Sequence, residues 1–460
     1  MFKVKVNSTI LYAENGALLS EVLMTSGISA DHPCGGKGIC KKCLVTINGR
    51  AELSCQYRIT EDVEVTLNDN SIESFSGAKA ENCRSQNMCY VLDLGTTTLA
   101  LALVSLDNKA IADIKEGVNS QRLYGADVIS RIEYCTKNGT EALQKAVIND
   151  VNSLISEMCV EKDLPLYLAG NTTMLHIFFG KDPSSIGVAP YTPQFLGSIT
   201  AKGCDLGLQG VSVAKALPSI HSFVGADVVS GINLVNDELN EKYNLLVDLG
   251  TNAEIALFSG DKIYCTSAAA GPCFEGASIT CGMSASRGAL CEYSEAGFKT
   301  VGGVSPKGIC GTGLVDIVAT LIRKGEIDKT GYMKSEKKFV APNIYITRDD
   351  VRQYQLAKSA VCSGITTLMK TADIGFEDIE RLYISGGFSA KINVENAVLT
   401  KLLPSELKGN AVSLHNSSLL GAVKYACHDD DLCEIVEKAE YVDLSQSKDF
   451  SDLFTENMMF

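Results

Sequence analysis

The segment YVLDLGTTTLALALVSLDNKAI, residues 90–111, returns with small changes as LLVDLGTNAEIALFSGDKIY, residues 245–264. Each copy has an apolar strand, a D-L-G-T turn and a second apolar strand, the pattern of a β-hairpin. Two further pairs follow in the same order: the strands of LPLYLAGNTTM and ERLYISGGFSA, and the Gly-Ala helices of HSFVGADVVSGINLV and HNSSLLGAVKYAC. These repeats predict a duplicated α/β body whose ligand lies in the cleft between the halves.

Helical spacing of apolar residues occupies the stretches between the predicted strands. GTEALQKAVINDVNSLISEMC in the first half and RDDVRQYQLAKSAVCSGITTLMK in the second half are the longest examples. We therefore expect each half to run as three strands, two helices, a fourth strand and two more helices.

The D-L-G-T turns carry the residue types that bind a nucleoside triphosphate. Glycine permits a tight turn, backbone N–H groups and threonine hydroxyls bond phosphate oxygens, and a carboxylate holds a hydrated magnesium ion. A later Gly-Gly pair leaves room for an adenosine against the backbone. The predicted ATP-binding residues are Gly95, Thr96, Thr97, Gly250, Thr251, Asn252, Gly386 and Gly387, and the predicted catalytic carboxylates, which position Mg²⁺ and water, are Asp93 and Asp248.

Asp127, in YGADVISRI, is a third carboxylate that we assign to the cleft. It either adds a polar group beside the nucleotide or caps the helix that follows it, and the sequence leaves both roles open.

The chain thus has two phosphate loops, a Gly-Gly strand end and two Gly-Ala helices. This set of features resembles the actin, sugar-kinase and heat-shock-chaperone superfamily. The resemblance implies an actin-like ATPase fold. It also implies that Gly225-Ala226 and Gly421-Ala422 lie on hinge helices, where small residues allow close crossing and domain closure.

The N-terminal stretch HPCGGKGICKKCLVTINGRAELSCQ, residues 32–56, concentrates cysteines around a glycine-rich loop. Cys34, Cys40 and Cys43 share the loop and Cys55 follows it, which supplies the four thiolates that a 2Fe-2S cluster requires. Zinc sites usually pair their cysteines as two C-x2-4-C units, so a zinc knuckle is the weaker alternative. The preceding residues predict a hairpin and a helix, and RITEDVEVTL predicts a closing strand.

This cysteine pattern resembles plant-type ferredoxin domains, although the first gap is longer and the last gap shorter than usual. The expected fold class is thus an α+β ferredoxin-like 2Fe-2S domain (β-grasp) followed by a duplicated α/β actin-like ATPase fold. We predict a ferredoxin-type domain at residues 1–67, a polar linker at 68–88, and ATPase halves at 89–240 and 241–460.

Bulk properties set limits on the partners. The 460-residue chain is 45% hydrophobic and has a net charge of −14 without a basic block, which argues against nucleic acid as a partner. No signal peptide or long apolar segment is apparent, so we expect a cytoplasmic protein without a membrane partner. The 17 cysteines indicate reduced thiols plus one metal site rather than a disulfide framework.

The stretches LAGNTTMLH, AAGPCFEGASITCGM, GICGTGLVDI and LYISGGFSAKI, together with the iron-sulfur module, resemble reductive activators of corrinoid proteins and corrinoid-dependent methyltransferases over essentially the whole chain. The resemblance implies that a low-potential donor, such as ferredoxin or flavodoxin, sends electrons through the 2Fe-2S cluster to an inactive Co(II) corrinoid on a partner protein. ATP would drive this return to Co(I).

The chain is shorter than many such activators, with the missing length between the iron-sulfur domain and the ATPase. Monomer and homodimer both stay open. The alternatives within the superfamily are a small-molecule kinase that carries a redox sensor and an ATP-binding redox regulator.

Overall fold

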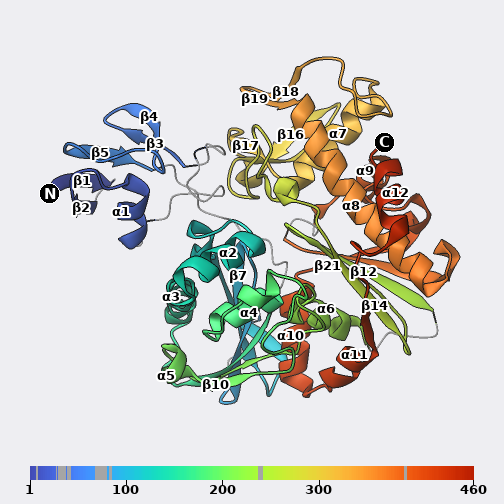
Figure 1. The fold of residues 1–460 in the computed structure, drawn as a ribbon, viewed down its shortest axis with the longest axis horizontal. Coiled ribbons are helices and arrows are strands. Elements are labelled where there is room, and N and C mark those ends of the chain that lie inside the picture. The colour runs from blue at the N-terminus through green and yellow to red at the C-terminus, as the bar shows by residue number, and fades with distance from the viewer. Residues whose placement is uncertain are drawn as a thin grey trace.

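The computed structural model describes residues 1–6, 9–26, 28, 38, 43–67, 80–81, 85–236, 242–387 and 391–460. Figure 1 shows a small N-terminal sheet domain beside a larger body that contains one extended sheet in each of its halves. Within the described ranges, no helix is long and apolar enough to cross a membrane.

The N-terminal domain is a mixed five-stranded sheet with the order β2-β1-β5-β3-β4 and one helix, which confirms the predicted hairpin, helix and closing strand. Its elements are β1 (Phe2–Val6), β2 (Thr9–Ala13), α1 (Leu19–Thr25), β3 (Leu44–Ile47), β4 (Arg50–Leu53) and β5 (Val63–Thr66). Alternation along β1 and β5 points Val4 and Val65 into a core that the apolar face of α1 covers with Leu19 and Leu23. The sequence did not reveal the β3–β4 hairpin, which turns at Asn48-Gly49 with positive φ angles at both residues.

The first half of the body contains a six-stranded sheet with the order β10-β11-β9-β6-β7-β8. Its strands are β6 (Met88–Leu94), β7 (Thr98–Ser105), β8 (Ala110–Val118), β9 (Leu164–Gly170), β10 (Thr200–Lys202) and β11 (Val211–Ala216). Its helices are η1 (Ser120–Leu123), α2 (Val128–Asn138), α3 (Glu141–Glu157), α4 (Thr172–Phe178), η2 (Ser184–Ile186), α5 (Gly203–Leu206) and α6 (Ala226–Val235). β6, the central strand, is almost wholly apolar, as expected for a strand covered on both faces.

The second half repeats this plan in a sheet with the order β21-β20-β12-β13-β14-β22. Its strands are β12 (Tyr243–Leu249), β13 (Ala253–Phe258), β14 (Ile263–Ala268), β20 (Ile379–Ser385), β21 (Ala411–His415) and β22 (Ala439–Tyr441). Its helices are α8 (Arg348–Ala372), η6 (Phe376–Asp378), α9 (Val394–Leu399), η8 (Ser405–Asn410), α10 (Ser417–His428), α11 (Leu432–Lys438) and α12 (Lys448–Glu456).

An additional small subdomain lies between β14 and α8, at the top of Figure 1. It comprises η4 (Pro272–Glu275), β15 (Ala289–Ser294), β16 (Gly297–Thr300), η5 (Val301–Gly303), β17 (Gly308–Ile309), α7 (Gly311–Arg323), β18 (Lys337–Ala341) and β19 (Ile344–Thr347). Its loop after β14 contributes residues to the cleft described below.

The two sheets share the order β11-β9-β6-β7-β8 and β21-β20-β12-β13-β14, which confirms the duplication. The predicted run of elements was incomplete, because each sheet has six strands rather than four. β10 and β22 each lie at an edge, while β11 and β21 form a fifth strand at the same position in both halves. Both strands are short and border a helix in sequence, and the residues of β21 are mostly half-buried rather than alternating. The apolar pattern of β11 covers only six residues and β21 has no alternation, so neither strand offers the sustained periodicity that sequence analysis detects.

The two halves meet where α6 crosses α10. A Cβ built at Gly421 of α10 would lie 1.8 Å from the carbonyl oxygen of Ser230 on α6, so the helix backbones touch there. Across the same contact, the Asn233 side-chain amide donates to the Gly421 carbonyl (3.2 Å), and Lys424 donates to the Asn233 carbonyl (2.8 Å). The predicted need for a small residue is confirmed at Gly421. Gly225 instead precedes α6, and a Cβ there would lie 2.5 Å from the Gly170 carbonyl oxygen, so it permits a different close contact.

Gly421→Ala should therefore destabilise the protein, although alanine normally favours a helix over glycine by about 1 kcal/mol. The added methyl group has no room against Ser230, and this overpacking should cost about 3 kcal/mol. Subtracting the helix preference of alanine leaves an expected net loss of about 2 kcal/mol in the free energy of unfolding. Urea titration of the purified protein measures it. Gly409→Ala is the matched control, because nothing lies within 4 Å of the Cβ it would add. Equal stabilities for the two variants would contradict the close crossing.

Candidate functional site

A cavity of about 430 Å³ lies between the two halves of the body. All eleven nucleotide and catalytic residues that the sequence predicted contribute to its wall. They are Asp93, Gly95, Thr96, Thr97, Asp127, Asp248, Gly250, Thr251, Asn252, Gly386 and Gly387. The fold thus brings together segments from both repeats at a single site.

The first D-L-G-T turn connects β6 to β7 and depends on its glycine. A Cβ at Gly95 would lie 2.4 Å from the carbonyl oxygen of Thr98. Arg131 holds the turn from behind: its guanidinium is fully buried and donates to the carbonyls of Thr96 (2.6 Å) and Gly125 (2.9 Å). Burial lowers the pKa of Arg131 to about 9. The sequence had not revealed this arginine.

The Asp93 carboxylate receives its hydrogen bonds from the opposite half of the body. Asn416 donates its side-chain amide (2.8 Å) and Ser418 its hydroxyl (2.7 Å), both at the start of α10. Burial raises the pKa of Asp93, and these two hydrogen bonds act in the opposite direction. The carboxylate is thereby oriented by the same helix that forms the contact between the halves.

Gly386 and Gly387 have different structural roles. Gly386 has a φ of +104°, and a Cβ there would lie 2.4 Å from the Leu249 carbonyl oxygen and 2.8 Å from Asp248 Oδ1. Nothing lies within 4 Å of a Cβ at Gly387. The first glycine therefore lets β20 approach the second phosphate loop, while the second leaves open space in the cavity wall.

Asp127 is both a helix cap and part of the cavity wall. It caps α2, accepting a hydrogen bond from the Ser130 backbone N–H (2.7 Å) while the Ser130 hydroxyl closes the capping box. The same residue lines the cavity.

Four further carboxylates in the cavity wall were missed: Glu116, Asp227, Glu254 and Glu275. Glu254 had a detectable signal, because it follows the second D-L-G-T turn and pairs directly with Asp248 across the β12–β13 hairpin. Asp227 directly follows the Gly-Ala pair that marks α6. Glu275 lies in AAGPCFEGASITCGM, a stretch that carries the family resemblance but no repeat that marks a nucleotide site, and Glu116 lies in a segment without either signal.

The buried carboxylates raise one another's proton affinity. Burial, with the charges of Asp227 and Asp93 added, raises the pKa of Asp248 to about 7. Burial also raises the pKa of Asp227 to about 6, and it raises that of Glu254 well above its usual range. Such a cluster favours any ligand that brings positive charge into the cavity.

A hydrated magnesium ion fits this wall. Glu116 Oε1 is buried and accepts no hydrogen bond from the described part of the chain, so it has a lone pair to offer a metal-bound water. Within the described ranges, no three His, Cys, Asp or Glu side chains converge to hold a metal directly. Mg²⁺ needs no such cage, because it usually keeps several waters and binds through one or two carboxylates and the phosphates of a nucleotide.

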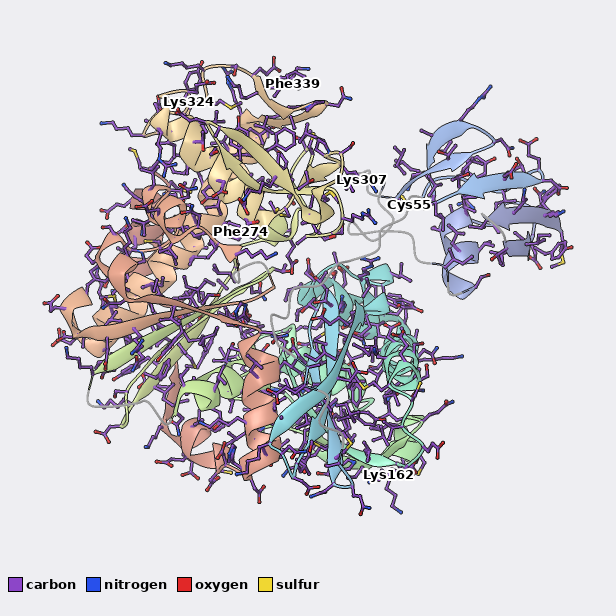
Figure 2. The ribbon with its side chains drawn as sticks, turned by 180° about the vertical axis from the view of Figure 1, so that it is seen from behind. Cys55, Lys162, Phe274, Lys307, Lys324 and Phe339 are labelled. Atoms are coloured by element: carbon purple, nitrogen blue, oxygen red, sulfur yellow. The ribbon has the colours of Figure 1, made fainter. Side chains whose placement is uncertain are left out.

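In the N-terminal domain, Cys43 and Cys55 are both buried and their sulfur atoms lie 3.1 Å apart. The side-chain amide of Gln56 donates to Cys55 Sγ (3.7 Å) and packs against Gly38. Figure 2 shows Cys55 at the edge of this domain that faces the body. The other two predicted ligands, Cys34 and Cys40, lie outside the described residues.

Burial raises the pKa of Cys43 to about 11. A thiol in this setting stays protonated unless a cation binds it, so the pair suits a site that metal binding deprotonates.

Two family descriptions match the chain: "RACo middle region" over residues 88–239, and "C-terminal domain of RACo the ASKHA domain" over residues 242–460. A solved structure named "Reductive activator for corrinoid,iron-sulfur protein" superposes with a TM-score of 0.74 at 26% identity. It covers 100% of this chain and 98% of its own.

Two characterised relatives carry related names. The "Corrinoid activation enzyme RamQ" of Eubacterium limosum is 28% identical over 574 aligned positions, covering 96% of each chain. The "[Co(II) methylated amine-specific corrinoid protein] reductase" of Methanosarcina barkeri is 26% identical over 79% of this chain and 75% of its own. An alignment of 574 positions is longer than this chain, so the first relative has residues that this chain lacks.

The raised pKa of Asp248 predicts how the stability of the metal-free protein depends on pH. The folded state binds this proton more tightly than the unfolded state, where the pKa is near 3.8. The resulting stabilisation is complete below that value and is lost as the pH rises through about 7. Between about pH 5 and pH 8, the free energy of unfolding of the wild-type protein should therefore fall. Asp248→Asn should make that fall smaller by on the order of 2 kcal/mol.

Chemical denaturation at several pH values, in EDTA and in Mg²⁺, measures this effect. We expect Mg²⁺ to restore the stability of the wild-type protein at the higher pH. Asp373→Asn is the control, because Asp373 lies at the end of α8 and outside the cavity. Parallel pH profiles for wild type and Asp248→Asn would contradict the assignment.

Proposed function

The chain belongs to the family of reductive activators of corrinoid proteins, and on that premise we propose that it uses ATP to return the inactive Co(II) corrinoid of a partner protein to Co(I). One observation supports this function most directly. The chain resembles a reductive activator over its full length. Along that length it contains both a nucleotide-sized cavity lined by the two phosphate loops and a domain with two adjacent buried thiols.

We assign residues 1–67 to the iron-sulfur domain, 68–88 to the linker, and 89–240 and 241–460 to the two ATPase halves. In this assignment, Cys34, Cys40, Cys43 and Cys55 hold a plant-type 2Fe-2S cluster, which supplies one-electron transfer when bound. Cys43 and Cys55 have the adjacency that ligands of one cluster need. Gln56 adds an amide N–H to the cysteine sulfur.

The body binds ATP with Mg²⁺ in the cavity between the halves. Asp93 and Asp248 hold the hydrated ion and position the attacking water, while Thr96, Thr97 and Thr251 donate hydroxyls to phosphate oxygens. Seven carboxylates but a single cation, Arg122, line the cavity within the described part of the chain. A polyphosphate therefore needs Mg²⁺ to overcome the repulsion between like charges.

Energetics explain why the reaction requires a nucleotide. Plant-type clusters have potentials near about −400 mV, and Co(I) is a stronger reductant, so the electron moves uphill. For one electron, about 59 mV corresponds to about 1.4 kcal/mol. A nucleotide contribution of about 4 kcal/mol would thus offset roughly 170 mV.

We further propose that the protein works in the cytoplasm with a low-potential donor such as ferredoxin or flavodoxin, as a monomer or a homodimer.

Anaerobic assay of Co(I) formation tests the function. We expect the reduced protein to convert a Co(II) corrinoid protein to Co(I) only in the presence of Mg-ATP, followed by the absorbance of Co(I). Cys43→Ala should abolish the reaction because it removes a cluster ligand, and Asp248→Ala should reduce it about a hundredfold or more because it disrupts the magnesium site. Glu437→Gln, at an exposed position on α11, is the control.

Co(I) formation that is independent of ATP, or that survives both substitutions, would contradict the proposal. Failure with several corrinoid partners, despite an intact cluster and bound ATP, would favour a kinase or a redox regulator.

Gln56→Leu should make the reduction potential of the cluster more negative. The amide N–H stabilises negative charge on Cys55 sulfur, and that charge is greater in the reduced cluster. Losing one hydrogen bond of about 1 kcal/mol corresponds to a shift of about 20 to 60 mV. Redox titration monitored by electron paramagnetic resonance measures it.

Thr9→Val is the control for this measurement. Thr9 is exposed on β2, at the edge of the sheet opposite the β3–β4 hairpin that carries the two cysteines. Equal potentials in Gln56→Leu and wild type would show that the amide does not act on the cluster.

A further inference from the structure

Glu275 connects the two phosphate loops. The hydroxyl of Thr97, in the first loop, donates to Glu275 Oε1 at 3.3 Å. The hydroxyl of Thr251, in the second loop, donates to Glu275 Oε2. One carboxylate thus joins residues from the two halves of the body, inside the cavity that all three side chains line.

The segment that carries Glu275 is closely packed. Phe274, labelled in Figure 2, is 1% exposed and packs edge-on against Tyr354 of α8 with ring centroids 5.8 Å apart. Gly276 has a φ of +78°, and a Cβ there would lie 2.2 Å from the Met283 carbonyl oxygen. Both neighbours of Glu275 are therefore constrained, so its side chain is held between the loops by its backbone as well as by the two threonines.

The Glu275 carboxylate offers the two threonine hydroxyls the same kind of acceptor that a phosphate group would offer. Both groups are anions with oxygen acceptors, and both suit hydroxyl donors such as those of Thr97 and Thr251. Burial raises the pKa of Glu275, while the two threonine hydrogen bonds and the charge of Arg131 act in the opposite direction. A polyphosphate that takes the same hydroxyls must displace this carboxylate or share the cavity with its charge.

We propose that Glu275 is an internal latch that competes with nucleotide phosphate for the hydroxyls of Thr97 and Thr251 and holds the two halves together until Mg-ATP releases it. The inference rests on the proposed ATP-binding function and concerns the regulation of that same site. Nucleotide binding then replaces the hydrogen bonds from Thr97 and Thr251 to Glu275 with hydrogen bonds from the same hydroxyls to phosphate oxygens. The two halves are afterwards linked through the nucleotide. The latch lowers the affinity for ATP and couples occupancy to the relative position of the halves.

Calorimetric titration of the full-length protein with Mg-ATP and with adenosine tests the latch. Glu275→Gln keeps the shape of the side chain, removes its charge and leaves one oxygen acceptor. We expect the Kd for Mg-ATP to fall about tenfold, because the phosphates no longer face a competing anion. The Kd for adenosine should not change, because adenosine has no phosphates. Glu437→Gln should leave both constants at their wild-type values.

An unchanged or larger Kd for Mg-ATP in folded Glu275→Gln would overturn the latch while leaving ATP binding intact. Failure of the wild-type protein to bind Mg-ATP would overturn the proposed function, and the latch with it.

Hydrogen–deuterium exchange on the wild-type protein gives a second test that does not depend on the variant folding. Mg-ATP, but not adenosine, should accelerate exchange in a peptide that spans residues 272–277, because Glu275 gives up both threonine contacts. Unchanged or slower exchange in that peptide on adding Mg-ATP would count against the latch.

Discussion

The close crossing of α6 and α10 is the constraint on which the cleft depends. Gly421 lets the two helix backbones touch at Ser230, and this contact fixes where α10 begins relative to β6. Asn416 and Ser418, at that beginning, orient Asp93 from the other half of the body. The absence of a side chain at Gly421 therefore sets the relative position of the two halves. The orientation of Asp93 in the first phosphate loop follows from that position.

The charge of the cleft follows from the same duplication. Each half places an aspartate at the end of its central strand, and bringing the halves together brings Asp93 and Asp248 into one cavity with Asp227 and Glu254. Burial, with the repulsion between neighbouring carboxylates added, raises the pKa values of Asp248 and Asp227, and this cost to the folded protein is one that a divalent cation would relieve. Binding of Mg²⁺ with a nucleotide thus stabilises the cleft as well as the phosphates.

Sequence analysis could predict those site residues that occur in both repeats of the body. The D-L-G-T turns appear twice, so their residues were identifiable, whereas Glu275 occurs once in a loop of the inserted subdomain and acts only through tertiary contacts. Arg131 looks like an ordinary helical arginine until the fold buries it behind Thr96. Sequence analysis did not predict strands β11 and β21 for a different reason. Pairing with neighbouring strands, rather than their own periodicity, determines their structure.

The chain also connects the cleft to the N-terminal sheet domain, through the residues that we assign to the linker. The linker enters the body as β6, which begins at Met88 and carries Asp93 near its far end. Before β6, the Glu81 backbone N–H donates to the Ile111 carbonyl (2.7 Å), and the hydroxyls of Ser85 and Ser105 bond at 2.9 Å, so the last part of the linker is attached to the same sheet. A rearrangement that shifts β6 when nucleotide replaces the Glu275 contacts would therefore move the point from which the linker leaves. The proposed uphill electron transfer would need nucleotide binding to alter the state of the redox partners. β6 would give that coupling a physical route, because it carries Asp93, a proposed magnesium residue, and directly follows the proposed linker.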